Sequence, residues 1–199
     1  MTPHMRRFVV LSAALLVSAT AAIAQGMTMA APPAGKLSIA ASPRATAVLS
    51  ISTGVRGAAP LKVTVDYGQP FARGRVVEGT LIPTAEVWRT GANAATSLVT
   101  DVDLRIGSVT VPKGSYTLYS IWSPSAGMQL IVNKQTGQWG TEYKKEMDLG
   151  RVAMTAKTLS ETRDAFVIAL EPAAANAAGG TLRLSWGKSE FSAPFTIAQ

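Results

Sequence analysis

Hydrophobic and polar residues alternate at every second position over much of the chain. Leu61, Val63, Val65 and Tyr67 alternate with Lys62, Thr64 and Asp66. The same alternation recurs in segments 102–106, 128–133, 151–154, 166–170, 182–186 and 191–197. Because successive side chains of a strand point to opposite faces of a sheet, this pattern predicts strands with one buried face and one solvated face.

Segment 115–122 (SYTLYSIW) differs, because it is apolar or aromatic at both alternating sets of positions. It is therefore predicted to be a central strand. Turn-forming residues stand where the strands should stop, at 68–70, 112–114, 123–125 and 187–189, and an Ala/Gly-rich loop is predicted at 172–180. Helical signals are few, with a short turn predicted at 85–89 and one short helix at 141–149.

About nine or ten short strands with frequent turns favour an all-β fold with at most one or two short helices. We expect an antiparallel β-sandwich or a jelly-roll-like arrangement. A closed barrel is the alternative. The chain is 199 residues long, which suits one compact domain at 42–199.

The N-terminus has the features of a secretory signal peptide. Arg6 and Arg7 precede the uncharged apolar run 8–19, and Ala22-Ile23-Ala24 is a small-x-small cleavage pattern. We expect residues 1–24 to be removed and residues 25–41, rich in Ala, Gly, Pro and Ser, to form a flexible leader. The predicted location is therefore outside the cytoplasm, in the periplasm or the medium, with no membrane attachment after cleavage.

The absence of two residue types excludes several chemistries. The chain has no cysteine, and its single histidine, His4, lies in the predicted signal peptide. The mature chain therefore has no Ser-His-Asp triad, no cysteine nucleophile and no usual ligand set for zinc, haem or iron–sulfur clusters. Phosphate-binding glycine motifs are also missing. We accordingly predict no cofactor, no metal and no catalytic residue.

The charge of the chain does not indicate a nucleic-acid partner. Cleavage would leave seventeen basic and twelve acidic residues, and the basic ones are scattered along the sequence. Nucleic-acid binding normally needs a concentrated basic stripe. Among the acidic residues, Asp101 and Asp103 stand two apart, which admits a calcium site in one strand, but we favour a polar strand edge.

The segment richest in chemical information spans residues 74–96. It combines glycines and small residues with two arginines, a tryptophan and an asparagine. Arginine presents a planar fork of donors that suits carboxylates and phosphates, so a small anionic or carbohydrate ligand is one interpretation. The other is a structural pin, with an arginine fixing the loop and the tryptophan filling the core. The predicted ligand-binding residues are Arg75, Trp88, Arg89, Asn93 and Thr96.

Several motifs of the chain resemble a bacterial domain-of-unknown-function family numbered 2911. The matching pieces are Ser42-Pro43, Tyr67-Gly68-Gln69-Pro70, Gly74-Arg75, the block Trp88-Arg89-Thr90-Gly91-Ala92-Asn93, Ala95-Thr96, Pro112-Lys113-Gly114-Ser115-Tyr116, Asn133 and Trp139-Gly140. The family often has Tyr-Gly after the proline that matches Pro83, where this chain has Thr84-Ala85. The resemblance implies an exported β-rich domain and implies no activity.

Taken together, the sequence favours a non-enzymatic module that binds a ligand or a partner. Two alternatives stay open, namely a structural envelope protein and a carboxylate-dependent hydrolase that acts on glycans. Neither the ligand nor the oligomeric state follows from the residues.

Overall fold

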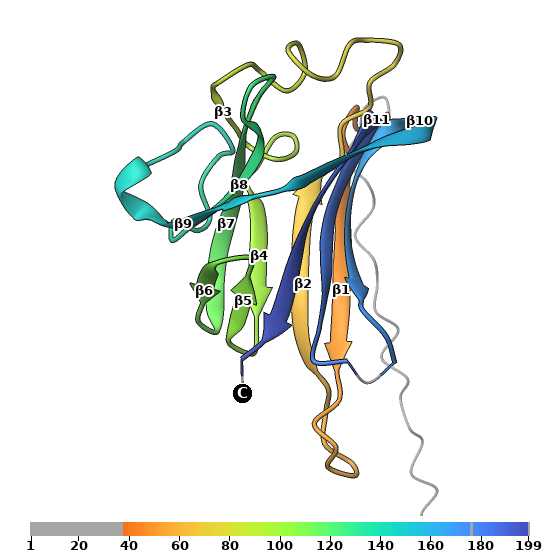
Figure 1. The fold of residues 1–199 in the computed structure, drawn as a ribbon. Helices are drawn as coiled ribbons and strands as arrows, with labels where there is room; N and C mark the ends of the chain where they lie inside the picture. Colours follow the sequence, from red (N-terminus) through yellow and green to blue (C-terminus); the bar gives the residue numbers. More distant parts are fainter. Residues whose placement is uncertain (1–37, 176, 199) are drawn as a thin grey trace, which may run out of the picture. The chain divides into compact units, whose positions relative to one another are not determined.

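The computed structural model describes residues 38–175 and 177–198 (Figure 1). The predicted signal peptide and most of the predicted leader lie outside these residues. The described chain from Ser38 onwards clusters as one compact unit. Its elements are β1 (Arg44–Ile51), β2 (Leu61–Gly68), β3 (Val87–Trp88), β4 (Thr96–Thr100), β5 (Leu104–Ile106), β6 (Val109–Val111), β7 (Gly114–Ser123), β8 (Gly127–Asn133), the 3-10 turn η1 (Lys145–Met147), β9 (Asp148–Ala153), β10 (Thr155–Pro172) and β11 (Gly179–Ile197).

The first sheet has the strand order β1-β2-β4-β7-β8-β9, with the short β3 added beside β7. All its pairings are antiparallel. The segment predicted as a central strand is β7, which pairs with β4 and β3 as well as with β8. That prediction is confirmed. The strand is ten residues long, which leaves room for β3 to pair with it as well as β4 and β8.

The second sheet has the order β10-β11-β5-β6 and is also antiparallel. Its longest strand, β11, folds back on itself. The amide of Ile197 donates to the carbonyl of Ala178 over 2.7 Å, so the two ends of β11 lie side by side. The reversal is at Gly187, whose φ of +59° is a conformation that glycine adopts without strain. The predicted turn at 187–189 therefore lies inside β11.

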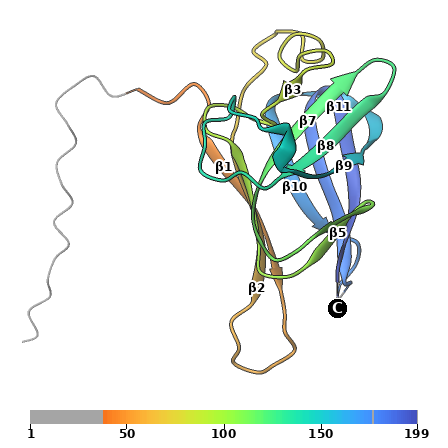
Figure 2. The same cartoon turned by 90° about the vertical axis from the view of Figure 1, so that its left-hand side faces the viewer.

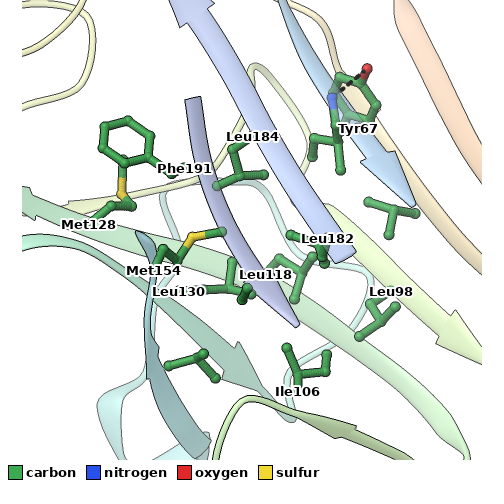
Figure 3. Close-up of a cluster of buried hydrophobic side chains, with 14 of the residues drawn as sticks. Tyr67, Leu98, Ile106, Leu118, Met128, Leu130, Met154, Leu182, Leu184 and Phe191 are labelled. Carbon is green, nitrogen blue, oxygen red and sulfur yellow. Dashed lines mark hydrogen bonds between the residues drawn. The ribbon is translucent and has the colours of Figure 1, made fainter. Parts of the chain in front are cut away.

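The two sheets enclose a common apolar core, and their edges approach each other where β1 meets β10 and where β6 meets β9. Figure 3 shows side chains of both sheets pointing toward one another, among them Leu118 and Leu130 from the first sheet and Leu182 and Leu184 from the second. The fold is an antiparallel all-β sandwich, as the alternation predicted. Within the described residues, no helix is long and apolar enough to cross a membrane.

The helix predicted at 141–149 is wrong. Only the 3-10 turn η1 forms there, and β9 begins at once at Asp148. The chain is held beside the end of β8 instead, because the amide of Lys134 donates to the carbonyl of Met147 and the side chain of Asn133 donates to the carbonyl of Lys144. These hydrogen bonds take carbonyl groups that a longer helix would need for its own amides.

Candidate ligand-binding site

The block Trp88–Asn93 leaves β3 and crosses the end of the first sheet that carries β3 (Figure 2). Thr90 and Asn93 both have positive φ, +50° and +62°, so the chain turns sharply twice within four residues. The turn is held by hydrogen bonds to buried side chains beneath it. Thr90 is fully buried, its hydroxyl lies 2.9 Å from that of Ser120, and its carbonyl accepts a hydrogen bond from the Thr96 hydroxyl over 2.9 Å.

Four of the five predicted site residues have structural contacts. Thr96 is fully buried beneath the loop. Trp88 is buried and packs edge-on against Phe166 in the core. Arg75 directs its guanidinium to carbonyls of its own loop, those of Phe71 and Ala72. Asn93 is exposed, and its side chain reaches the carbonyl of Ser42 at 3.4 Å.

Arg89 is the exception. It is half-buried and forms no hydrogen bond or ion pair with any other residue in 38–175 or 177–198. Its aliphatic stem runs across Gly140, where an added Cβ would come within 2.7 Å of Arg89 Cδ and 2.6 Å of the carbonyl oxygen of Asn93. The absence of a side chain at Gly140 therefore sets the path that the arginine takes. The side chains of Arg75, Asn93 and Thr96 bond to other described residues, whereas the guanidinium of Arg89 does not.

A cavity of about 290 Å³ lies beside this arginine. Its walls come from the loop before β3, from β3 itself, from β7 and from the loop before η1. The lining residues are Thr80, Leu81, Pro83, Val87, Trp88, Arg89, Tyr119, Gly140, Thr141 and Tyr143. Arg89 is the one charged residue among them, so the described wall has a net positive charge and no carboxylate.

Two tyrosines supply aromatic walls. The rings of Tyr119 and Tyr143 meet edge to face, with centroids 5.0 Å apart. The hydroxyl of Tyr119 donates to the carbonyl of Glu142 and accepts from the Gln138 amide, whereas the hydroxyl of Tyr143 donates to Asp148 and accepts from Arg151. Both hydroxyl protons are therefore already donated inside the protein.

Burial raises the pKa of both tyrosines above the ordinary value. For Tyr119, burial is the larger cause and the charge of Glu142 adds to it, while the hydrogen bond from Gln138 acts in the opposite direction. For Tyr143, burial comes first, followed by the hydrogen bond to Asp148 and the charge of that carboxylate, with Arg151 opposing. Both hydroxyls consequently stay protonated at neutral pH, so neither offers a tyrosinate as a base.

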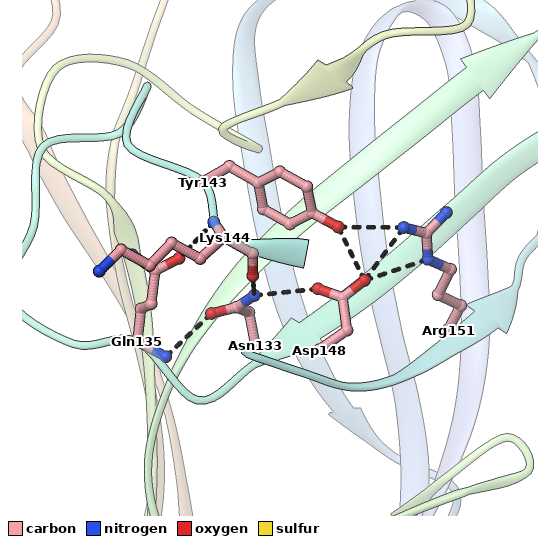
Figure 4. Close-up of polar contacts among 6 residues, drawn as sticks. All are labelled: Asn133, Gln135, Tyr143, Lys144, Asp148 and Arg151. Atoms are coloured by element: carbon pink, nitrogen blue, oxygen red, sulfur yellow. Dashed lines mark hydrogen bonds and ion pairs between the residues drawn. The ribbon is translucent and has the colours of Figure 1, made fainter. Parts of the chain in front are cut away.

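A polar network behind the cavity fixes Tyr143 (Figure 4). Asp148 lies at its centre, accepting from Tyr143, Arg151 and Asn133. Asn133 is fully buried, and its side-chain oxygen also accepts from the amide of Gln135. Burial works against the charge of Arg151, but the bonds to Asp148 and Tyr143 outweigh it and raise the arginine pKa. The ring of Tyr143 is thus held in one orientation by this network.

The two carboxylates that suggested a cation site instead accept hydrogen bonds from backbone amides. Asp101 accepts from the amide of Lys62 at 2.8 Å, and Asp103 accepts from the amide of Lys113 at 2.7 Å. Both bonds join the ends of neighbouring strands or turns, which is the polar strand edge that the sequence favoured. Within the described part of the chain, no group of three or more acidic, histidine or cysteine side chains is placed to hold a metal ion.

Most of the cavity wall has no distinctive signal in the local sequence. Tyr119 lies in a strand that is apolar on both faces, so its pattern favours core packing over contact with a sugar. Tyr143 falls in the segment predicted as a helix. The pairing of Trp139 with Ala94 brings the segment before η1 against the Trp88–Asn93 block, and no local pattern predicts that contact across 45 positions.

These features define a class of protein, namely an antiparallel all-β sandwich whose end loops form a small cavity with a single cationic side chain in its described wall. A family model described as "Protein of unknown function (DUF2911)" matches residues 50–195, and the chain belongs to this family. No curated protein and no solved structure is similar enough to the chain to match it.

Proposed function

We propose that the protein is an exported, non-enzymatic binding module that holds a small acidic ligand in the cavity beside Arg89. The observation that carries the proposal is the state of that arginine. It lines a concave site, it is the one charge in the described wall, and no other described residue is paired with it. A guanidinium in such a position recognises a carboxylate or a phosphate through paired hydrogen bonds.

The rest of the wall favours a ligand that carries a ring. Trp88, Tyr119 and Tyr143 contribute aromatic surface, and Thr80 and Thr141 add hydroxyl groups. The cavity, at about 290 Å³, is just smaller than most ligand pockets, which measure roughly 300–1,000 Å³. A single sugar acid has the size and the mixed character that this wall suits, and it satisfies both halves of the expectation of an anionic or carbohydrate ligand.

Binding is favoured over catalysis by the same wall. A hydrolase that acts on glycans needs two carboxyl groups facing the scissile bond, whereas no acidic residue is among the described residues lining the cavity. The two tyrosines are protonated near neutral pH, as any tyrosine with a pKa of about 10 is, and burial raises their pKa values further. Export is part of the proposal and is supported by the charged start, apolar run and cleavage pattern of residues 6–24.

A titration with a matched pair of sugars tests this function. Glucuronate and glucose differ by one carboxylate, so calorimetry should detect glucuronate binding and much weaker glucose binding. Arg89→Gln should remove the preference for the acid, since it replaces the cation with a neutral amide of similar reach. Arg56→Gln is the matched control, because Arg56 is an exposed arginine in the loop between β1 and β2. Inorganic phosphate and citrate extend the panel to other anions.

The proposal fails if no anion of the panel binds, or if Arg89→Gln binds glucuronate as well as the parent protein does. Thermal unfolding of each variant should accompany the titrations. A native-state ligand raises stability by about 2.7 kcal/mol at 100-fold excess over its dissociation constant, so an anion-dependent shift lost in Arg89→Gln and kept in Arg56→Gln supports the site.

A further inference from the structure

The loop between β1 and β2 stands apart from the rest of the described chain. Every residue from 52 to 60 is exposed, and Figures 1 and 2 show the loop extending away from the two sheets. Among the described residues its hydrogen bonds stay within the loop, such as the one from the amide of Ala58 to the carbonyl of Val55 over 3.2 Å. An added Cβ at Gly54 or Gly57 would meet no heavy atom within 4 Å apart from its chain neighbours. The backbone of this loop is therefore open to a partner.

Arg56 lies in the middle of this loop. Its side chain is exposed and is joined to no other part of the described chain by a hydrogen bond or an ion pair. The residue before it, Val55, is 66% exposed, and the residue after it, Gly57, has no side chain and a φ of +81°. Exposed loops with small residues are where proteases cut folded proteins. A serine protease that carries a carboxylate in its specificity pocket selects a basic residue such as this one.

The other exposed basic residues of 38–175 and 177–198 are held more firmly. Each of them lies in a strand, in η1 or in a turn where its own backbone amide is hydrogen-bonded. The amide of Lys113, for example, donates to Asp103 over 2.7 Å, and the amide of Lys134 donates to the carbonyl of Met147 over 2.8 Å. Because a protease takes up the backbone of its substrate, such sites must first open locally. The loop at Arg56 has only its own short-range bonds to give up.

We propose that the peptide bond between Arg56 and Gly57 is a cleavage site for a serine protease that selects basic residues. Hydrolysis consumes one water. Its hydroxyl joins the carbonyl carbon of Arg56 and its proton joins the nitrogen of Gly57 as the bond between them breaks, which leaves a new carboxylate and a new amine in the loop. The inference does not depend on the ligand proposed for Arg89. β1 begins close to the loop that carries Arg89, where Arg44 donates to the carbonyl of Ala94, and its eight residues run about 26 Å away from it.

The two pieces should stay together after the cut. β1 pairs with β2 along its whole length, from Arg44 opposite Gly68 to Ile51 opposite Leu61, and alternate side chains of β1 pack against the core. Cleavage therefore converts one chain into two chains that are joined by a strand pairing. Since the folded state then contains two molecules, its unfolding temperature becomes dependent on protein concentration.

Limited digestion of the mature chain with trypsin tests the site. Mass spectrometry should place the first cut beyond residue 38 directly after Arg56, and cuts before residue 38 are told apart by their masses. Arg56→Gln should slow this first cut about tenfold or more, because the remaining described sites need local opening of the fold. Size-exclusion chromatography of the cut protein should return both fragments in one peak.

Lys113→Gln is the matched control. It removes an exposed basic residue from another turn and keeps the backbone bond to Asp103, so its digestion should proceed as in the parent protein. The unfolding temperature of each variant checks that the fold is kept. A first cut elsewhere between residues 38 and 198, or equal rates for Arg56→Gln and Lys113→Gln, would overturn the proposed site. Separation of the fragments without denaturant would overturn the two-chain product.

Discussion

The indole rings of Trp88 and Trp186 stack with their centroids 5.8 Å apart and their planes within 15° of parallel. This contact joins β3 of the first sheet to β11 of the second, and it fixes the residue that immediately precedes Arg89. The cationic side chain therefore projects from a point anchored in the core. Trp88 fills the core, as one interpretation of the sequence expected, and it also lines the cavity.

Replacing Trp88 should therefore destabilise the whole sandwich. Trp88→Ala removes the stacking on Trp186 and the edge contact with Phe166, and we expect a loss of about 3–5 kcal/mol in the free energy of unfolding. Urea denaturation measures it. Trp139→Ala is the comparison, because Trp139 is 50% exposed and should cost less than about 1 kcal/mol. Similar losses in the two variants would contradict the assigned burial.

The hydroxyl and the ring of Tyr143 should have separable effects. Tyr143→Phe removes the hydrogen bonds to Asp148 and Arg151, which should lower the unfolding free energy by about 1–3 kcal/mol. It keeps the ring, so glucuronate affinity should change by less than about twofold. Tyr143→Ala removes the wall as well and should weaken binding clearly. Calorimetry on both variants decides whether the ring contacts the ligand, and an equal loss in both would assign the contact to the hydroxyl.

Raised tyrosine pKa values make the protein sensitive to alkali. Burial raises the pKa of Tyr116, Tyr119 and Tyr143 in the folded chain, so the unfolded chain loses these protons at lower pH. The stability they confer is full below about pH 10, the unfolded value, and declines as the pH rises toward the folded values.

Urea unfolding between pH 8 and pH 11 should show this decline. The free energy of unfolding should fall by up to about 1.4 kcal/mol per pH unit for each proton that the folded chain keeps and the unfolded chain loses. The double variant Tyr119→Phe/Tyr143→Phe carries two fewer such groups, so its stability should fall less steeply over the same range. A slope equal to that of the parent protein would show that other groups cause the alkaline loss.

Gly140→Ala tests the packing of Arg89. The added methyl meets the stem of Arg89 and the carbonyl of Asn93, so one of them must shift. We expect a loss of about 1–3 kcal/mol in stability together with weaker glucuronate binding. Thr141→Ala, an exposed neighbour, should leave stability within about 0.5 kcal/mol. Unchanged binding by Gly140→Ala would show that the ligand does not depend on the path of the arginine.

The proposed export has a direct readout. Mass spectrometry of protein secreted from an expressing bacterium should give a chain that begins at Gln25, because cleavage is predicted after Ala24. Ala24→Arg replaces the small residue at the cleavage position and should leave the precursor uncleaved. A full-length chain found in the cytoplasm would refute the proposed location.

Much of the fold could be predicted from alternation, and two of the strands that it misses share a cause. Alternation misses β1 because its inward positions begin with Ala45 and Ala47, which are weakly apolar. It misses β4 because the buried face of that strand carries Thr96 and Thr100 beside Leu98. In both strands small or hydroxylated side chains share the buried face with leucine or isoleucine, so the contrast between the two faces is faint in the sequence.

The candidate site also contains residues that the sequence could indicate and residues that it could not. Arg89 could be singled out because an arginine among glycines and small residues is unusual in a strand-rich chain. Tyr143 could not, and the strand pattern favoured a core role for Tyr119, since the two rings reach the cavity through hydrogen bonds of Asp148 and through strand pairing. Long-range pairing is a property of the assembled sheets and has no local periodicity.

The stacking of Trp88 on Trp186 also constrains when the cavity can exist. These residues are 98 positions apart, and the Tyr67 hydroxyl accepts a hydrogen bond from an amide 101 positions away, at Ile168. Contacts of such sequence separation form late, because a long stretch of chain must be ordered first. During synthesis the segment around Arg89 emerges from the ribosome long before its partner in β11. An incomplete chain therefore lacks this cavity, which forms only once β11 has been added.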